Sequence, residues 1–250
     1  MATYFFIGVL CLIGGVVFLN KHPDGITVYI ISILIILGIT ISILHNISKK
    51  KFEEEVLTHL HNCRVGMFIE ELTNLMGRKR SRQISSFYAS LCATAYDVMG
   101  DYDALFASCQ NIKLKPHMSV YHRRMFSYYM SRNELDYAKD ALDALTKLAE
   151  AEKNPAEKKV IVMFEEECKR ALQIHDGEYE EPMKYLSEKI KSTGPEPLVT
   201  RVNWSYVYGE LLYLTDNKEA AKEPLMFASS RGGDTKYKKQ ADKLLAEITN

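Results

Sequence analysis

The first 45 residues of this 250-residue chain almost lack charged side chains. They contain one basic residue, Lys21, and one acidic residue, Asp24, whereas the whole chain has 32 Lys and Arg and 32 Asp and Glu. The net charge of zero therefore conceals two regions of different composition, which meet near residue 45.

The chain also has no net charge, no closely spaced pair of cysteines and no excess of glycine or proline. A net charge of zero argues against a nucleic-acid-binding protein, which usually has a basic face or a high isoelectric point. The 13 Gly and 7 Pro are too few for a fibrous or disordered chain. Five scattered cysteines without a CxxC motif indicate neither a disulfide framework nor a zinc site, so we expect free thiols in a reducing compartment. These cysteines are Cys11, Cys63, Cys92, Cys109 and Cys168.

Two uncharged apolar stretches predict a transmembrane hairpin within residues 1–48. Residues 2–19 and 26–44 would span about 27–29 Å as helices, close to the hydrocarbon thickness of a bilayer. Residues 20–25 form a polar turn between them, with Pro23 as a helix breaker. The alternative for the first stretch is a cleaved signal peptide. The stretch lacks the basic segment and the clear cleavage site that are typical of such a peptide. Because neither stretch contains an Asp, Glu, Lys, Arg or His residue, we expect an anchor rather than a pore.

Lysine residues near the ends of the predicted spans indicate their orientation. Lys49, Lys50 and Lys51 follow the second span directly, whereas the turn between the spans offers only Lys21. Because positive residues favour the cytoplasmic side, we expect both termini and the long C-terminal part in the cytoplasm. The short turn suits a bacterial plasma membrane, with an organellar membrane as the alternative. A second basic cluster at residues 78–82 either contacts anionic lipid or forms a solvated loop.

Residues 46–250 have the apolar spacing of helices almost throughout and predict an all-α region. Sustained alternation and Asn-Gly dipeptides, which mark strands and hairpins, are missing. Residues 49–82 predict a juxtamembrane helix pair, and residues 83–250 predict further pairs in an array. Residues 234–250 predict a single terminal helix with one apolar stripe, which suits a cap that keeps the array soluble. In total we expect five helix pairs and one capping helix.

A recurring turn pattern divides the array into repeated units. Gly100, Asn133, Gly177 and Asp216 occupy equivalent turn positions, at spacings of 33, 44 and 39 residues. Glycine, asparagine and aspartate tolerate the left-handed backbone with which helices often end. We expect an acidic residue after each turn to cap the next helix, and a small residue early in that helix to let the two helices approach closely.

This pattern resembles the tetratricopeptide repeat family. That family places a Tyr four residues before a Gly-Asp-Tyr turn and a small residue five positions after the Gly. The first unit matches through Tyr96 and Gly100–Tyr102, but Leu105 occupies the small position. The other units match in part, and the last two spacings exceed the usual length of about 34 residues. The resemblance covers about residues 83–230 and implies hairpins stacked into a curved α-solenoid.

The sequence contains no recognisable catalytic, cofactor-binding or metal-binding motif. The patterns GxxxxGK[ST], GxSxG and HExxH are missing, and the single Trp204 belongs to no recognisable triad. His59 and His61 lie two positions apart, so on a helix they point to different faces rather than to one metal ion. Runs of glutamate such as Glu165–Glu167 suit solvated helix faces. We therefore expect a protein that is not an enzyme and that carries no cofactor and no metal.

The resemblance also implies that the first helix of each pair lines a concave groove. By helical phase, ten residues of these helices form its open face, together with Asp97 and Ala171. The ten are Phe87, Ser90, Thr94, Arg123, Ser127, Met130, Glu167, Tyr206, Glu210 and Tyr213. Exposed tyrosine, arginine and methionine side chains often anchor protein interfaces. For Tyr206 and Tyr213, packing against a neighbouring pair is the alternative.

Together these features predict a scaffold, anchored in the lipid bilayer, whose cytoplasmic groove recruits a protein or peptide partner. The alternative is an accessory subunit of a membrane complex for transport, secretion or envelope synthesis, in which the spans contact the partner. Residues 46–82 carry a net charge of +3 and residues 83–250 a net charge of −3. This distribution favours a partner of basic or mixed charge over nucleic acid.

Overall fold

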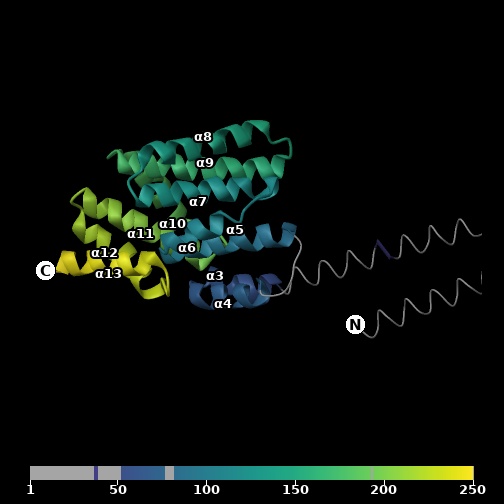
Figure 1. Cartoon of the computed structure of the whole chain (residues 1–250). Helices are drawn as coiled ribbons and strands as arrows, with labels where there is room; N and C mark the ends of the chain where they lie inside the picture. The colour runs from purple at the N-terminus through teal and green to yellow at the C-terminus, as the bar shows by residue number, and fades with distance from the viewer. Residues whose placement is uncertain (1–36, 39–51, 77–81, 193, 250) are drawn as a thin grey trace, which may run out of the picture. The chain divides into compact units, whose positions relative to one another are not determined.

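The computed structural model of the chain describes residues 37–38, 52–76, 82–192 and 194–249 (Figure 1). The chain forms two compact units, Met1–Glu55 and Val56–Asn250, and the fold presented below is that of the second unit. The predicted spans at residues 2–19 and 26–44 lie outside the described residues, except for positions 37 and 38. Within the described ranges, no helix is long and apolar enough to cross a membrane.

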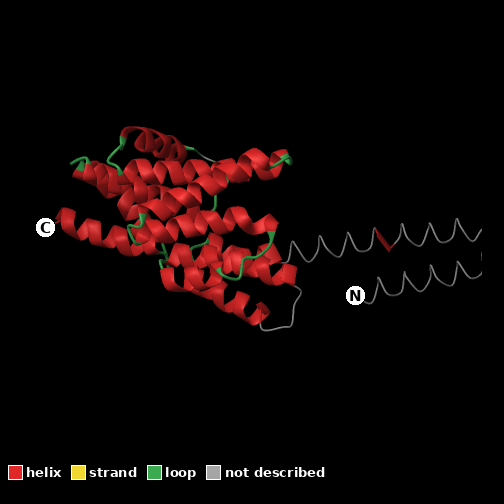
Figure 2. Ribbon diagram, turned by 45° about the horizontal axis from the view of Figure 1, so that its top comes forward, coloured by secondary structure: helices red, strands yellow, loops and turns green. Residues whose placement is uncertain are grey.

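The described elements of the second unit are helices (Figure 2), which confirms the predicted all-α fold for this part of the chain. Eleven α-helices follow the π-helical segment η2 (Glu53–Leu57), and a 3₁₀ turn, η3 (Lys115–His117), precedes α7. The α-helices are α3 (Thr58–His61), α4 (Val65–Met76), α5 (Arg82–Met99), α6 (Tyr102–Cys109), α7 (Met118–Ser131), α8 (Leu135–Ala151), α9 (Pro155–His175), α10 (Glu180–Lys191), α11 (Leu198–Leu214), α12 (Lys218–Arg231) and α13 (Lys236–Thr249).

Consecutive helices form five hairpins, followed by α13 as a single last helix (Figure 1). The hairpins are α3–α4, α5–α6, α7–α8, α9–α10 and α11–α12, as the sequence predicted. Successive hairpins pack side by side in a solenoid-like arrangement, in which α5 contacts α7 and α7 contacts α9. The fourth hairpin is splayed, because α10 packs more extensively on α11 than on its own partner α9.

One type of left-handed turn closes all five hairpins. The turn residues Cys63, Gly100, Asn133, Gly177 and Asp216 have φ angles of 60°, 82°, 58°, 83° and 60°. In each turn, the amide of the following residue donates to the carbonyl five positions earlier, at 2.8–3.0 Å. This bond is the signature of a helix that ends in a Schellman turn. The four predicted turn positions are confirmed, and Cys63 adds a fifth.

The second helices of the hairpins begin differently from one another. Asp101 caps α6, since its side chain accepts a hydrogen bond of 3.1 Å from the Ala104 amide. The N-cap residues of α8, α10 and α12 make no side-chain cap bond, so the prediction of an acidic cap is confirmed only for α6. The position expected to hold a small residue is buried in all four later hairpins. It is occupied by Leu105, Ala138, Pro182 and Ala221.

The core consists of apolar clusters between neighbouring helices. Ala93, Cys109 and Met125 join α5, α6 and α7, while a second cluster fills the space between α7, α8 and α9. A third cluster joins α11, α12 and α13. In it, Gly209 lets α11 and α12 approach so closely that an added Cβ would lie 2.7 Å from Leu225 Cγ.

The first and last hairpins of the array contact each other. Helix α3 contacts α11, and α13 contacts α5. The Asp234 amide donates to the Cys63 carbonyl at 3.0 Å, and Asp234 Oδ2 accepts a bond of 3.2 Å from the Gly66 amide. Cys63 is fully buried in the same apolar cluster as Val202 and Ala241. The expectation that α13 only caps one end of the array is therefore incomplete, because this helix also joins the two ends.

Candidate functional site

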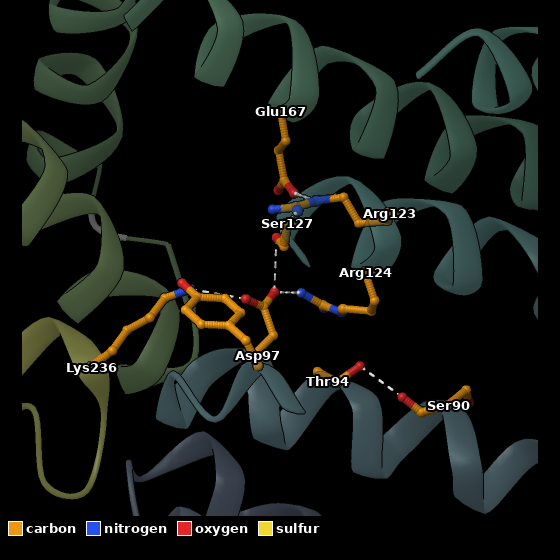
Figure 3. A network of polar contacts seen from close by, with 9 residues as sticks. Ser90, Thr94, Asp97, Arg123, Arg124, Ser127, Glu167 and Lys236 are labelled. Atoms are coloured by element: carbon orange, nitrogen blue, oxygen red, sulfur yellow. Dashed lines mark hydrogen bonds and ion pairs between the residues drawn. The ribbon is translucent and has the colours of Figure 1, made fainter. Parts of the chain in front are cut away.

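A buried carboxylate on α5, Asp97, is the centre of a polar network inside the helical unit (Figure 3). Its Oδ2 accepts hydrogen bonds from the Arg124 guanidinium and, at 3.2 Å, from the Ser127 hydroxyl. Its Oδ1 accepts a bond of 2.9 Å from the Lys236 ammonium. Arg124 and Ser127 lie on α7, whereas Lys236 is the first residue of α13. The network therefore ties three helices together.

Charge pairing determines the ionisation of this network. Burial alone would raise the pKa of Asp97, but Lys236, Arg124 and Arg123 outweigh it and hold that pKa well below its usual range. Burial likewise opposes the charge on Lys236, but the neighbouring Asp97 outweighs it and raises the pKa of Lys236. Both groups are therefore charged at neutral pH, and removal of either would leave an uncompensated charge in the interior.

Arg123, a predicted groove residue, extends the network to α9. Its Nε donates to Glu167 Oε2 at 3.2 Å, and its Nη1 donates to the Ser127 hydroxyl at 2.8 Å (Figure 3). Burial opposes the charge on Arg123, but Cys168, Glu167 and Asp97 raise its pKa. Arg123, Ser127 and Glu167, which lie on the first helices α7 and α9, thus contact one another. Their polar groups are engaged with one another.

The predicted groove residues on α5 lie only partly at the surface. Phe87 is 40 % exposed and Thr94 is half-buried, whereas Ser90 and Asp97 are buried. The Ser90 hydroxyl donates to the Phe87 carbonyl at 2.7 Å, and the Thr94 hydroxyl donates to the Ser90 carbonyl at 2.9 Å. On α7, Met130 is half-buried against the core between α7, α8 and α9. The predicted exposure is therefore wrong for Ser90 and Asp97, because α7 and α13 cover this face of α5.

Helix α13 also covers the predicted groove residues on α11. Tyr206 is buried, so its predicted exposure is wrong, and its ring lies 6.0 Å from that of Tyr237 on α13. The Tyr206 hydroxyl donates a hydrogen bond to the half-buried Glu210. Burial raises the pKa of Glu210, and this effect outweighs the hydrogen bond from Tyr206, which acts to lower the pKa. The Tyr213 hydroxyl donates to Glu247 of α13 at 2.9 Å. Tyr206 and Tyr213 therefore both pack against α13, which was the alternative left open for them.

Sequence reasoning missed two members of the network, Arg124 and Lys236. Lys236 lies 139 residues from Asp97 in the chain, and it begins a lysine-rich helix whose charged side was expected to face water. Arg124 follows Arg123 directly, and adjacent helical residues point to different faces. Helical phase placed Asp97 on the open face of α5, so no local signal pointed to its burial against α7 and α13.

A second candidate site is a pocket of about 450 Å³ between α10, α11 and α12, which we call the Trp204 pocket. Trp204, Tyr208 and Phe227 supply aromatic surface, and each of these side chains is half-buried. The full lining consists of Ser187, Ile190, Lys191, Arg201, Trp204, Ser205, Tyr208, Leu212, Ala220, Glu223, Pro224 and Phe227. The sequence did not predict this pocket, because its three walls come from two different hairpins.

The cations around the Trp204 pocket have no ion-pair partner among the described residues. Lys191 and Arg201 line the pocket and are exposed. The Arg201 guanidinium lies 5.4 Å from the centre of the Phe227 ring, and Lys189 Nζ lies 5.8 Å from that of Trp204. Of the lining residues, Glu223 alone is acidic. The pocket thus combines aromatic surface with two exposed cations, Lys191 and Arg201, that form no ion pair among the described residues, and with one carboxylate, Glu223.

Nucleophilic and metal chemistry finds little support in the described part of the chain. Its four cysteines are free and buried. Burial raises the pKa of Cys63 and Cys168 to about 11 and that of Cys109 to about 12, so these thiols stay protonated at neutral pH. His59 Nε2 lies 3.3 Å from a Glu71 carboxylate oxygen. Among the described residues, no group of three or more His, Cys, Asp or Glu is placed to hold a metal ion.

The Trp204 pocket has the chemistry of a binding site. Aromatic faces bind apolar groups, and unpaired lysine and arginine side chains bind anionic ones. No family model matches the chain, and neither a curated protein nor a solved structure matches it. The function is therefore argued from the residues and the geometry of the chain itself.

Proposed function

We propose that this protein is a membrane-anchored scaffold of tetratricopeptide-like helical hairpins that recruits a protein partner. Five hairpins with one type of left-handed turn support the likeness to that family. The uncharged stretches at residues 2–19 and 26–44 support a two-span anchor in the bilayer. The single observation that carries the binding role is the Trp204 pocket with its unpaired cations.

The Trp204 pocket takes the place of the inner groove in this proposal. Arg123 and Glu167 are paired with each other. Asp97 is paired with Arg124 and Lys236 in the interior, and breaking such a buried ion pair costs about 3–5 kcal/mol. Arg201 and Lys191 are exposed and have no ion pair to break among the described residues. Tryptophan, tyrosine and arginine are also the residues that most often dominate binding energy at interfaces.

We place the helical unit in the cytoplasm of a bacterial cell, beneath the plasma membrane. The support is the run Lys49–Lys51 directly after the second apolar stretch, because positive residues favour the cytoplasmic side. An activity reporter fused after Asn250 tests this orientation. Activity in the cytoplasm agrees with it, and activity only outside the cytoplasm overturns it.

Photo-crosslinking in cells tests recruitment at the pocket. A photo-reactive amino acid replaces Glu223, which lines the pocket and is exposed, or Lys243, which is exposed on α13. We expect a discrete protein adduct from position 223, identified by mass spectrometry, and none of that mass from position 243. Absence of any adduct at position 223 in cells grown under several conditions would contradict the recruitment role.

The second candidate is an accessory subunit whose spans contact the partner. Small residues spaced four apart, Cys11 and Gly15 in the first stretch and Gly38 and Ser42 in the second, suit close packing of a further helix. Replacement of residues 1–45 by an unrelated two-span hairpin separates the two candidates. A position-223 adduct that survives the exchange favours the scaffold, whereas its loss favours the subunit.

A further inference from the structure

We propose that the Trp204 pocket binds a short acidic segment of the partner, with one or two bulky apolar side chains as its anchor. This inference rests on the scaffold function proposed above and specifies the chemistry of the ligand. It replaces the expectation of a basic or mixed-charge partner, which came from the net charge of residues 83–250, with one based on the cations at the pocket itself. Three features of the pocket carry it: its volume, its aromatic walls and its unpaired cations.

The volume and the walls select the anchor. A volume of about 450 Å³ lies in the lower part of the range of ligand pockets, about 300–1,000 Å³, and suits one or two large side chains. Trp204, Tyr208 and Phe227 offer ring faces from two helices, and aromatic rings pack well on leucine and phenylalanine. Close packing of α11 on α12 at Gly209 holds the two helices that carry the aromatic walls against each other, which favours a pre-organised pocket.

The cations without an ion pair at the pocket favour a ligand segment with negative charge. The half-buried arginines Arg123 and Arg124 each pair with a carboxylate of the chain. At the pocket, Arg201 and Lys189 rest only on aromatic rings, and Lys191 has no partner among the described residues. Carboxylates of a ligand would therefore gain charge-assisted hydrogen bonds without breaking an existing ion pair.

The spread of these cations favours a peptide over a lipid. Lys189 and Lys191 lie on α10, whereas Arg201 lies on α11, so the positive charge is distributed over two walls of the pocket. A segment with several carboxylates can pair with cations on both walls. A single-chain lipid carries only one anionic headgroup, so it offers fewer charges to these cations than such a segment does. The geometry therefore points to a peptide ligand.

The test uses Trp204 as the reporter, because it is the only tryptophan in the chain. The full chain is placed in nanodiscs with a tryptophan-free scaffold protein, and its fluorescence is followed during titration. The probe is a peptide of about 12 residues with one leucine and one phenylalanine among glutamates. Three matched probes accompany it: the same peptide with both anchors changed to alanine, the same peptide with lysine in place of glutamate, and dodecyl phosphate.

Three variants locate the binding event. Arg201→Glu reverses one exposed cation at the pocket, and Ala220→Phe adds a ring at an exposed lining position. Lys243→Glu is the matched control, since Lys243 is exposed on α13 and has no ion-pair partner among the described residues. We expect the acidic anchored peptide to bind at least tenfold more weakly to Arg201→Glu and to Ala220→Phe, and within twofold of the wild type to Lys243→Glu.

Several results would overturn the proposal. Equal affinity for the acidic and basic peptides would show that the cations do not select the ligand. Equal affinity for the acidic peptide and its alanine version would show that the apolar side chains do not anchor it. Saturable binding of dodecyl phosphate without binding of the acidic peptide would assign the pocket to a lipid. A cellular adduct at position 223 that the acidic peptide does not displace would refute this ligand while leaving recruitment intact. Peptide binding in vitro without any cellular adduct would instead count against recruitment.

Discussion

The left-handed turn residues determine where each hairpin closes, and two of them form a matched pair for experiment. Gly100 and Gly177 have φ angles of 82° and 83°. An added Cβ at Gly100 would lie 3.0 Å from Lys236 Cβ, whereas one at Gly177 would have no neighbour within 4 Å. The two positions thus share the backbone conformation and differ in their surroundings.

We expect Gly177→Ala to lower the free energy of unfolding by about 1 kcal/mol, the usual cost of a left-handed non-glycine residue. Gly100→Ala should cost more, because its methyl group also crowds Cβ of Lys236, which must shift to make room. Thermal unfolding followed by circular dichroism measures both variants. Equal losses would show that the contact with Lys236 contributes nothing to stability.

The buried Asp97 supports a second prediction at this scale. Asp97→Asn leaves Arg124 and Lys236 without their carboxylate, and such a loss typically costs about 3–5 kcal/mol. Denaturant unfolding measures this loss. Asp143→Asn on α8 is the matched control, because Asp143 is exposed, and it should change stability by less than about 0.5 kcal/mol. A loss at Asp97 as small as that at Asp143 would contradict the account of the network.

The same carboxylate predicts how stability depends on pH. The pKa of Asp97 is lowered in the folded protein, relative to about 3.9 in an unfolded chain. Its contribution to stability is therefore fully present above about pH 5 and is lost as the pH falls below the unfolded value. Unfolding curves between pH 7 and pH 3 should show this loss in the wild type and a smaller one in Asp97→Asn. Parallel curves for the two proteins would exclude this role.

Local sequence was sufficient to predict the turns but not the contacts across the molecule. Gly100, Asn133, Gly177 and Asp216 were found because a left-handed residue is selected by its own backbone conformation. The pairing of Asp97 with Lys236 joins positions 139 residues apart, and no local pattern encodes it. Trp204 was visible as the only tryptophan of the chain, but its pocket arises from the packing of three helices.

Among the helices, α13 differs most from expectation. The sequence predicted an amphipathic cap, and its stripe does pack on the cluster between α11 and α12. The same helix also supplies Lys236 to Asp97 of α5 and Glu247 to Tyr213 of α11. It therefore occupies the face that the first helices of the hairpins were expected to leave open to a partner.

A pair of alanines on α13 tests its role at the scale of the element. Ala241 is fully buried against α11 and α12, whereas Ala246 is exposed. Ala241→Glu places a carboxylate in an apolar cluster and should lower the free energy of unfolding by at least about 2 kcal/mol. Ala246→Glu adds the same side chain to the same helix and should stay within about 0.5 kcal/mol of the wild type. Similar unfolding midpoints for both variants would mean that α13 does not stabilise the unit.

At the scale of the whole molecule, the contact between the first and last hairpins explains why the pocket and not the groove is proposed as the binding site. Asp234 binds the turn at Cys63, and α13 contacts α5. With the inner polar groups engaged by the chain itself, a partner reaches accessible aromatic and cationic groups at the Trp204 pocket. The helical hairpins predicted beyond the apolar stretches are thus confirmed for the described residues. The assignment of the inner face to a partner assumed an array whose two ends do not touch, whereas here they are in contact.

The most direct test of this account is the yield of the position-223 adduct when only the rim of the pocket changes. Arg201→Glu and Lys243→Glu are introduced separately into the chain that carries the photo-reactive residue at position 223, and adducts are quantified at equal protein levels. The account predicts at least a tenfold loss of adduct in Arg201→Glu and an unchanged yield in Lys243→Glu. Equal yields in the two variants would contradict recruitment through the Trp204 pocket.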